Sequence, residues 1–145
     1  MAKIYLSSVI DVPVQKVWEY IRDFNELPKW FPGLTDSKIE AGMRSDQVGC
    51  IRDFGLQAGG RVREQLLAVS DHDHAFTYKM LEGPIPVTNY LAHVRLLPVT
   101  DGDKTFAEYK VEFDCAREQE KDLIAFLSNF FNTAFEHLKQ HAGKS

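Results

Sequence analysis

The sequence has little of what marks a disulfide-rich, membrane-spanning or secreted protein. It contains only two cysteines, Cys50 and Cys115, which are too few for a disulfide scaffold. We expect two independent core thiols, with a single bridge as the alternative. No apolar run approaches the ~20 residues that a membrane span needs. Met1-Ala2-Lys3 leads directly into an alternating segment without the apolar stretch of a secretory signal. These absences predict a cytoplasmic protein with no membrane span.

An excess of positive charge is also missing. The net charge is −4, and Arg61 and Arg63 stand beside Glu64 rather than in a basic run. This balance argues against a nucleic-acid partner, and nothing in the sequence indicates a particular protein partner. Hydrophobic residues make up 44% of the 145 positions, which is enough for a full core. Without a linker, repeat or low-complexity tract, we predict a single domain over residues 1–145.

The end of the chain, from about residue 121, carries an apolar helical face that is too wide for an ordinary surface helix. At about 100° per residue, its apolar side chains fall within an arc of roughly 180°, whereas a surface helix usually has a stripe of about 100°. The opposite side is polar, with Asp122, Asn129 and Glu136. The helix is therefore expected to lie against something large. Around the arc, the apolar residues are Phe126, Phe130, Leu123, Ala134, Leu127, Leu138, Phe131, Ile124 and Phe135.

Most of the remaining chain predicts β-strands separated by turns. An opening strand over residues 3–11 is followed by a helix that begins near Pro13, because proline suits the first helical turn. A second short helix is expected within residues 24–32. Asp101-Gly102 is a strong hairpin signal, and the short connections predict an antiparallel meander. The further predicted strands cover residues 34–41, 48–56, 61–71, 74–82, 87–99 and 105–115.

A seven-stranded antiparallel sheet must bury one face, and the C-terminal helix is its only large partner. We therefore predict an α+β helix-grip fold, in which the sheet curves around the long helix and two short helices follow the first strand. A helix laid across a curved sheet can enclose a cavity. That possibility directs the functional interpretation.

This order of elements resembles the START-like superfamily, also called the Bet v 1-like, SRPBCC or polyketide cyclase/dehydrase fold. Trp30-Phe31-Pro32, Gly49-Cys50-Ile51-Arg52-Asp53 and Thr88-Asn89-Tyr90 are similar to bacterial relatives of the plant abscisic acid receptors. The resemblance spans essentially the whole chain. It implies a cavity for a small hydrophobic molecule or lipid between the sheet and the long helix.

The resemblance also implies which positions line the cavity and which loops close it. A gate loop corresponds to residues 56–60 and a latch loop to residues 83–87, including Gly59, Gly60, Pro84, Ile85 and Pro86. Where the plant receptors use a lysine and a His-Arg-Leu latch, this chain has Thr35 and Ile85-Pro86-Val87. Hormone sensing and phosphatase docking are therefore not expected. The implied cavity positions are Phe54, Leu56, Val62, Glu64, Tyr78, Tyr90, Tyr109, Phe126, Phe130 and Ala134.

Strand alternation independently singles out Glu64. It shares a strand face with Val62, Leu66 and Ala68, so its carboxylate would stand in a mostly apolar space. Desolvation would raise its pKa unless a partner compensates, and Arg52 is the candidate partner. Three alternatives stay open for Glu64: a structural ion pair, a ligand contact or an acid–base role. An ion pair that lines a cavity could also contact the ligand.

Three tyrosines and two histidines complete the candidate groups. Tyr78, Tyr90 and Tyr109 each offer an apolar ring with a polar tip, which suits recognition of a ring system, although core packing is the simpler alternative. His72 and His74 are two residues apart and could ligate zinc. Since no third ligand is evident, they are better interpreted as polar turn residues. We predict no metal and no cofactor.

These observations lead to three functional hypotheses. The first is binding of a small hydrophobic, ring-containing molecule, oriented by Arg52, Glu64 and the tyrosines. The second is a polyketide cyclase/aromatase-like or dehydratase-like enzyme that uses Glu64 and a tyrosine as acid and base, because such chemistry needs little beyond a shaped site and a positioned proton carrier. The third is a closed core without a cavity, in a protein that acts through its surface.

Overall fold

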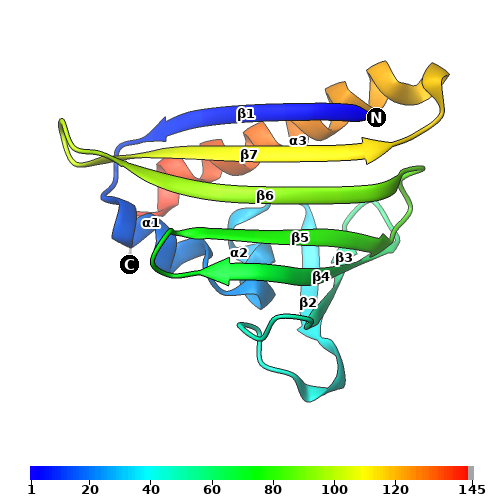
Figure 1. Cartoon of the computed structure of the whole chain (residues 1–145), viewed down its shortest axis with the longest axis horizontal. Coiled ribbons are helices and arrows are strands. Elements are labelled where there is room, and N and C mark those ends of the chain that lie inside the picture. Colours follow the sequence, from blue (N-terminus) through cyan, green and yellow to red (C-terminus); the bar gives the residue numbers. More distant parts are fainter. Residues whose placement is uncertain (144–145) are drawn as a thin grey trace.

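The computed structural model describes residues 1–143 and contains an antiparallel sheet of seven strands (Figure 1). The order across the sheet is β1-β7-β6-β5-β4-β3-β2. Strands β2 to β7 therefore form a meander in chain order, and β1 pairs with β7. The predicted helix-grip architecture is confirmed. The strands are β1 (Ala2–Ile10), β2 (Leu34–Ile39), β3 (Ile51–Leu56), β4 (Arg61–Ser70), β5 (Ala75–Glu82), β6 (Thr88–Val99) and β7 (Lys104–Asp114).

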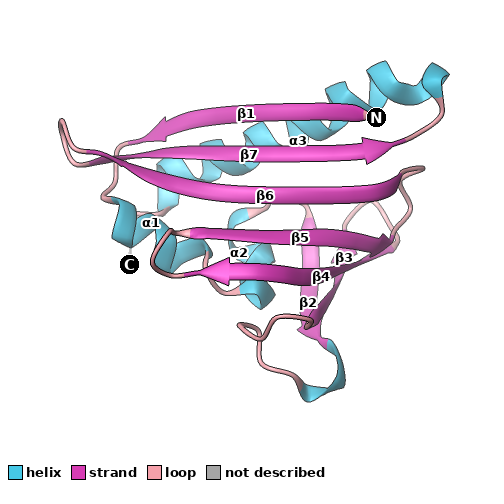
Figure 2. Ribbon diagram, in the orientation of Figure 1, coloured by secondary structure: helices cyan, strands magenta, loops and turns pink. Residues whose placement is uncertain are grey.

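The helices are α1 (Val14–Ile21), α2 (Leu27–Trp30) and the long α3 (Glu120–His141). In Figure 2, α3 runs behind β1, β7 and β6, and the short helices lie toward one end of the sheet. α3 packs on β1 and α2, while α1 packs on β6 and β7. Within residues 1–143, none of the helices is both long and apolar enough to span a bilayer.

Turn chemistry explains where several strands begin and end. Gly102 and Asp103 both have positive φ, which closes the predicted hairpin between β6 and β7. β3 begins at Ile51 rather than at residue 48, because Gly49 has a φ of +97° and lies in a turn. β2 ends at Ile39, shortly before Ala41 takes a φ of +60°. The predicted boundaries were therefore too long on both strands.

The alternation of β4 is interrupted by a bulge. Val62, Glu64 and Leu66 face inward as predicted and are buried. Between Leu66 and Ala68 the register against β5 shifts, which turns Ala68 outward. The prediction that Ala68 continues the inner face was wrong, because an extra residue in a strand reverses the facing of those after it.

The short helices and the later part of α3 cover the inner side chains of the sheet and complete the core. Trp18 and Trp30 are almost completely buried, and the Trp18 indole N–H donates to Asp71 Oδ1 at 2.7 Å. On α3, the Phe131 ring stacks on Tyr109 with ring centres 4.3 Å apart. The buried stripe of α3 comprises Leu127, Phe131, Ala134, Phe135 and Leu138. The first of these buried residues is Leu127, so the first turns of α3 contribute little to the core.

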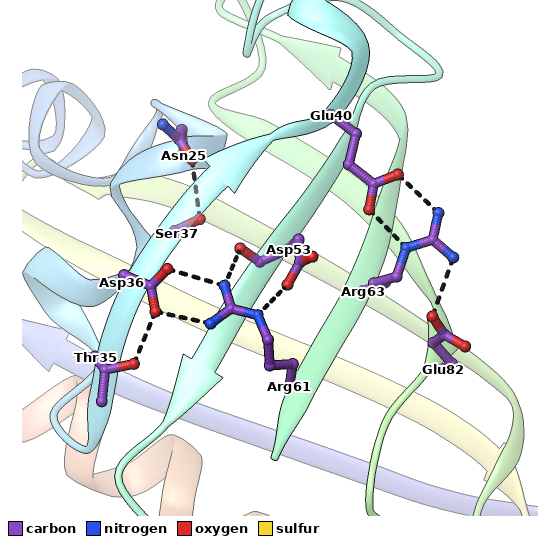
Figure 3. Close-up of polar contacts among 9 residues, drawn as sticks. All are labelled: Asn25, Thr35, Asp36, Ser37, Glu40, Asp53, Arg61, Arg63 and Glu82. Carbon is purple, nitrogen blue, oxygen red and sulfur yellow. Dashed lines mark hydrogen bonds and ion pairs between the residues drawn. The ribbon is translucent and has the colours of Figure 1, made fainter. Parts of the chain in front are cut away.

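The outer face of β2, β3 and β4 is held by ion pairs (Figure 3). Arg61 binds Asp36 on β2, with Nη2 2.9 Å from Oδ2, and Asp53 on β3, with Nε 2.6 Å from Oδ1. Its guanidinium lowers the pKa of Asp36 to about 2. Arg63 likewise joins Glu40 to Glu82. A single exposed ion pair contributes little to stability. Here each arginine binds two carboxylates, and Arg61 links the edge strand β2 to β3 and β4.

We predict that the two ends of the aromatic face on α3 differ sharply in their contribution to stability. Phe131→Ala removes a ring that is 3% exposed and should lower the free energy of unfolding by about 3–5 kcal/mol. Phe126→Ala, at a position that is 57% exposed, should change it by less than about 1 kcal/mol. Urea denaturation followed by circular dichroism measures both. Equal losses would contradict the division of the helix.

Candidate functional site

A cavity of about 280 Å³ lies between the inner face of the sheet and the first half of α3. Its walls are almost entirely apolar and rich in aromatic rings. The strand wall comes from alternate inward positions of β3, β4, β5 and β6. It consists of Phe54, Leu56, Val62, Glu64, Tyr78, Met80 and Tyr90. The opposite wall consists of Leu27, Phe31, Phe126, Leu127, Phe130 and Phe131, and Ala58, Gly59, Pro84 and Ile85 come from loops.

Most of the predicted ligand-binding residues meet at this cavity, but three do not reach its wall. Arg52 lies beneath Glu64 and is 1% exposed. Tyr109 faces inward as predicted, but its ring is covered by Phe131. Ala134 lies beyond the cavity along α3, in the part of the helix that packs in the core. For these three positions the expectation of direct cavity contact is corrected.

Several lining residues were not identified from the sequence. Met80 follows Tyr78 by two positions on β5, so strand alternation could have found it. Phe31 follows α2 in extended backbone and carries no periodic signal. It lies at the centre of an aromatic cluster, with ring centres 5.1 Å from Phe130 and 6.1 Å from Phe131. Leu127 and Phe131 belong to the predicted apolar arc but not to the implied cavity positions, and they both anchor the helix and line the cavity.

The mouth of the cavity is formed by two loops and by the exposed ring of Phe126. Gly59 and Gly60 have φ angles of +105° and +94°, a conformation that favours glycine. A Cβ on Gly60 would lie 3.3 Å from Pro84 Cγ, so the two loops touch each other. Pro84 and Ile85 line the cavity, whereas Gly60 and Pro86 do not. The loops occupy the expected places, and their movement as gate and latch stays a prediction.

The floor of the cavity contains a buried ion pair. Arg52 and Glu64 lie directly opposite each other on β3 and β4, with side chains 1% and 5% exposed. Arg52 Nε and Nη2 donate to Glu64 Oε1 at 2.9 and 2.6 Å. Arg52 Nη1 donates to the carbonyl oxygen of Phe24 at 3.1 Å. The guanidinium carbon also lies 3.8 Å from the centre of the Phe24 ring and 4.6 Å from that of Tyr78.

Burial dominates the electrostatics of this floor. Desolvation raises the pKa of Glu64, although Arg52 acts in the opposite direction through its charge and hydrogen bonds. The hydroxyl groups of Tyr78 and Tyr109 are hydrogen-bonded to each other. Burial also raises the pKa of both tyrosines, so they stay neutral. The polar groups at or behind the inner wall are therefore the carboxylate of Glu64 and the neutral hydroxyl groups of Tyr78 and Tyr109.

Other candidate groups lie away from the cavity. His72 and His74 are in the turn between β4 and β5, where the His74 ring lies 5.6 Å from that of Trp18. No cluster of three or more side chains suited to a metal ion is present in residues 1–143. Cys50 and Cys115 are both free, and burial raises the pKa of Cys50. None of these four side chains lines the cavity.

The whole described chain matches a known protein family. A family model described as "polyketide cyclase / dehydrase and lipid transport" covers residues 1–143. The chain belongs to this family. The predicted membership of the START-like, Bet v 1-like superfamily is thereby confirmed.

Solved structures agree with the family assignment. XoxI from Bacillus cereus is 26% identical, with a TM-score of 0.87 over 97% of this chain and 94% of that one. A protein from Nitrosospira multiformis is 28% identical, with a TM-score of 0.83 over 98% of this chain and 97% of that one. Major latex-like protein 151 from Panax ginseng is only 16% identical and shows the fold alone, with a TM-score of 0.78 over 97% of each chain.

We predict that Arg52→Met leaves Glu64 as an unpaired buried acid. The loss should be about 3–5 kcal/mol of unfolding free energy at neutral pH. Without Arg52, the pKa of folded Glu64 rises further. A carboxyl group with a higher pKa in the folded than in the unfolded state favours folding while it is protonated. This contribution is fully present below the unfolded pKa of about 4.3, and it is lost as the pH rises through the folded pKa. The deficit relative to wild type should therefore be larger at pH 8 than at pH 5.

Urea denaturation at both pH values measures this deficit. The control is the double variant Arg52→Met/Glu64→Leu, which replaces both partners by apolar side chains. It should recover most of the stability and lose the extra pH dependence, because no buried charge is left without a partner. An equal deficit for Arg52→Met at pH 5 and pH 8 would contradict the interpretation.

Proposed function

We propose that this family member binds a small hydrophobic, ring-containing molecule in the cavity between the sheet and α3. The observation that carries the proposal is an apolar space left open beneath an aromatic helix face. Phe126 is 57% exposed and Phe130 is half-buried, although both lie on the apolar side of α3. A well-packed core would cover such rings. Their position at the cavity supports a ligand as the missing partner.

The size and lining of the cavity support the chemical class. Its volume of about 280 Å³ is near the lower end of typical small-molecule sites, which favours a ligand of one or two rings over a long lipid chain. Phe31, Phe54, Tyr78 and Phe130 offer faces and edges to an aromatic ring. Burial of about 200 Å² of apolar surface would contribute about 5 kcal/mol before the costs of association. Since a dissociation constant of 1 mM corresponds to about 4 kcal/mol, we expect affinities in the millimolar range for simple probes.

One observation favours a second candidate, a cyclase-like or dehydratase-like enzyme. Glu64 is a buried carboxyl group with a raised pKa on the wall of the cavity, and Tyr78 is a neutral proton donor on the same wall. In that case, Glu64→Gln should abolish turnover of a linear polyketone that cyclises to an aromatic product, while the affinity for it changes little. Product formation followed by absorbance tests this role. Wild-type turnover in the variant would remove Glu64 as the acid or base.

For the binding proposal, we predict that Phe130→Lys abolishes binding of a neutral fluorescent dye such as N-phenyl-1-naphthylamine. The variant places a charged chain in an apolar wall, so affinity should fall by about tenfold or more. Asn129→Lys is the matched control, because it adds the same charge one residue away on the exposed side of α3. Its dye binding should equal that of wild type. Fluorescence titration gives the affinities, and circular dichroism establishes that each variant is folded.

Unchanged dye binding by folded Phe130→Lys would remove the cavity as the binding site. A wild-type protein that binds no apolar dye and carries no small molecule in native mass spectrometry would favour a closed core. In that case the surface hypothesis would replace the proposed function.

A further inference from the structure

The two carboxylate oxygens of Glu64 have different surroundings. Both hydrogen bonds from Arg52 end on Oε1, and no hydrogen bond among residues 1–143 ends on Oε2. Glu64 is only 4% exposed, and it lines the cavity. In the same residues, no completely buried side-chain oxygen or nitrogen lacks a hydrogen-bond partner. Since Oε2 has no partner, it must be reachable from the cavity rather than enclosed by protein.

This oxygen is the one charged group that the described chain offers on the cavity wall. An ionised carboxylate accepts hydrogen bonds and donates none, whereas the tyrosine hydroxyl groups on the wall can do either. Oε2 therefore distinguishes a ligand that donates from one that only accepts. A buried acceptor without a partner is also costly, so a donating ligand gains more there than it would at an exposed carboxylate.

The surroundings of the ion pair also define the charge that the ligand can carry. Arg52 does not line the cavity, and each of its three side-chain nitrogens donates a hydrogen bond to Glu64 or to the carbonyl oxygen of Phe24. An anionic ligand would therefore meet Oε2 and not the guanidinium. A cationic ligand would add an uncompensated charge, because Arg52 already balances Glu64. A neutral donor satisfies Oε2 without either cost.

We propose that the cavity selects a neutral ring compound whose hydroxyl or N–H group donates a hydrogen bond to Oε2 of Glu64. This inference rests on the proposed function of ligand binding and names the class of ligand. It places Glu64 as the residue that orients the ring within an otherwise apolar space. Carboxylic acids in their ionised form are excluded by the same oxygen.

Three compounds on one ring system test this selection at pH 7: 2-naphthol, 2-methoxynaphthalene and ionised 2-naphthoate. The first donates a hydrogen bond, the second only accepts, and the third carries a negative charge. Wild-type protein should bind 2-naphthol about tenfold to a hundredfold more tightly than 2-methoxynaphthalene, as expected for a hydrogen bond to a charged group. It should bind 2-naphthoate most weakly. Displacement of a fluorescent dye gives all three affinities.

Glu64→Gln should remove the preference while it preserves the shape of the wall. Its amide oxygen can accept from Arg52 as Oε1 does, which leaves the amide N–H₂ toward the cavity. The ratio between 2-naphthol and 2-methoxynaphthalene should then fall to less than about threefold. The matched control is Glu40→Gln, which changes a carboxylate paired with Arg63 on the outer face. Its preference should equal that of wild type.

The outcomes separate this inference from the proposed function. If 2-naphthol and 2-methoxynaphthalene bind wild type equally well, the donor requirement is overturned and the binding function stands. Tightest binding of 2-naphthoate, or an unchanged preference in folded Glu64→Gln, also overturns the role of Oε2. If none of the three compounds binds folded wild-type protein, the proposed function fails and the inference fails with it.

Discussion

The buried ion pair between Arg52 and Glu64 lies at the boundary between the packed core of this protein and its cavity. Two charges inside a protein are stable only when their hydrogen-bonding capacity is met, and a buried pair is not stabilising by itself. Here the pair is supported by the Phe24 carbonyl oxygen and by the rings of Phe24 and Tyr78. Apolar side chains of α3 gain nothing by packing directly on a carboxylate. The cavity lies over this part of the inner face, with Glu64 as its charged wall residue among those described.

Around this pair, the strands and loops contribute some side chains to the packing of the protein and others to the cavity. β4 sends Arg61 and Arg63 to the outer ion pairs and Val62 and Glu64 to the cavity, so one strand serves both faces. The loops after β3 and β5 meet at Gly60 and complete the mouth. The solved relatives share the overall fold in which these elements are arranged.

Strand alternation, turn residues and the wide apolar arc were sufficient to predict the fold from the sequence. Strand alternation predicted that Glu64 faces inward, and the resemblance implied the same for Tyr109; both are buried. These patterns could not show which inward residues contact the cavity, because that depends on where α3 crosses the sheet. Tyr109 is covered by Phe131 for this reason, and Ala134 lies too far along the helix. The bulge that turns Ala68 outward depends on pairing with β5, which no local pattern records.

The uneven burial of α3 has a thermodynamic consequence. Its later turns are held by the buried Phe135 and Leu138, whereas near its start Phe126 is exposed and Leu123 is only partly buried. Amide hydrogens in those first turns should therefore exchange with solvent faster than those in the later turns. A ligand bound at the proposed site would supply contacts that the chain itself lacks there. Slower exchange at the start of the helix and occupancy of the cavity are then two measures of one linked equilibrium, and each must shift the other by the same free energy.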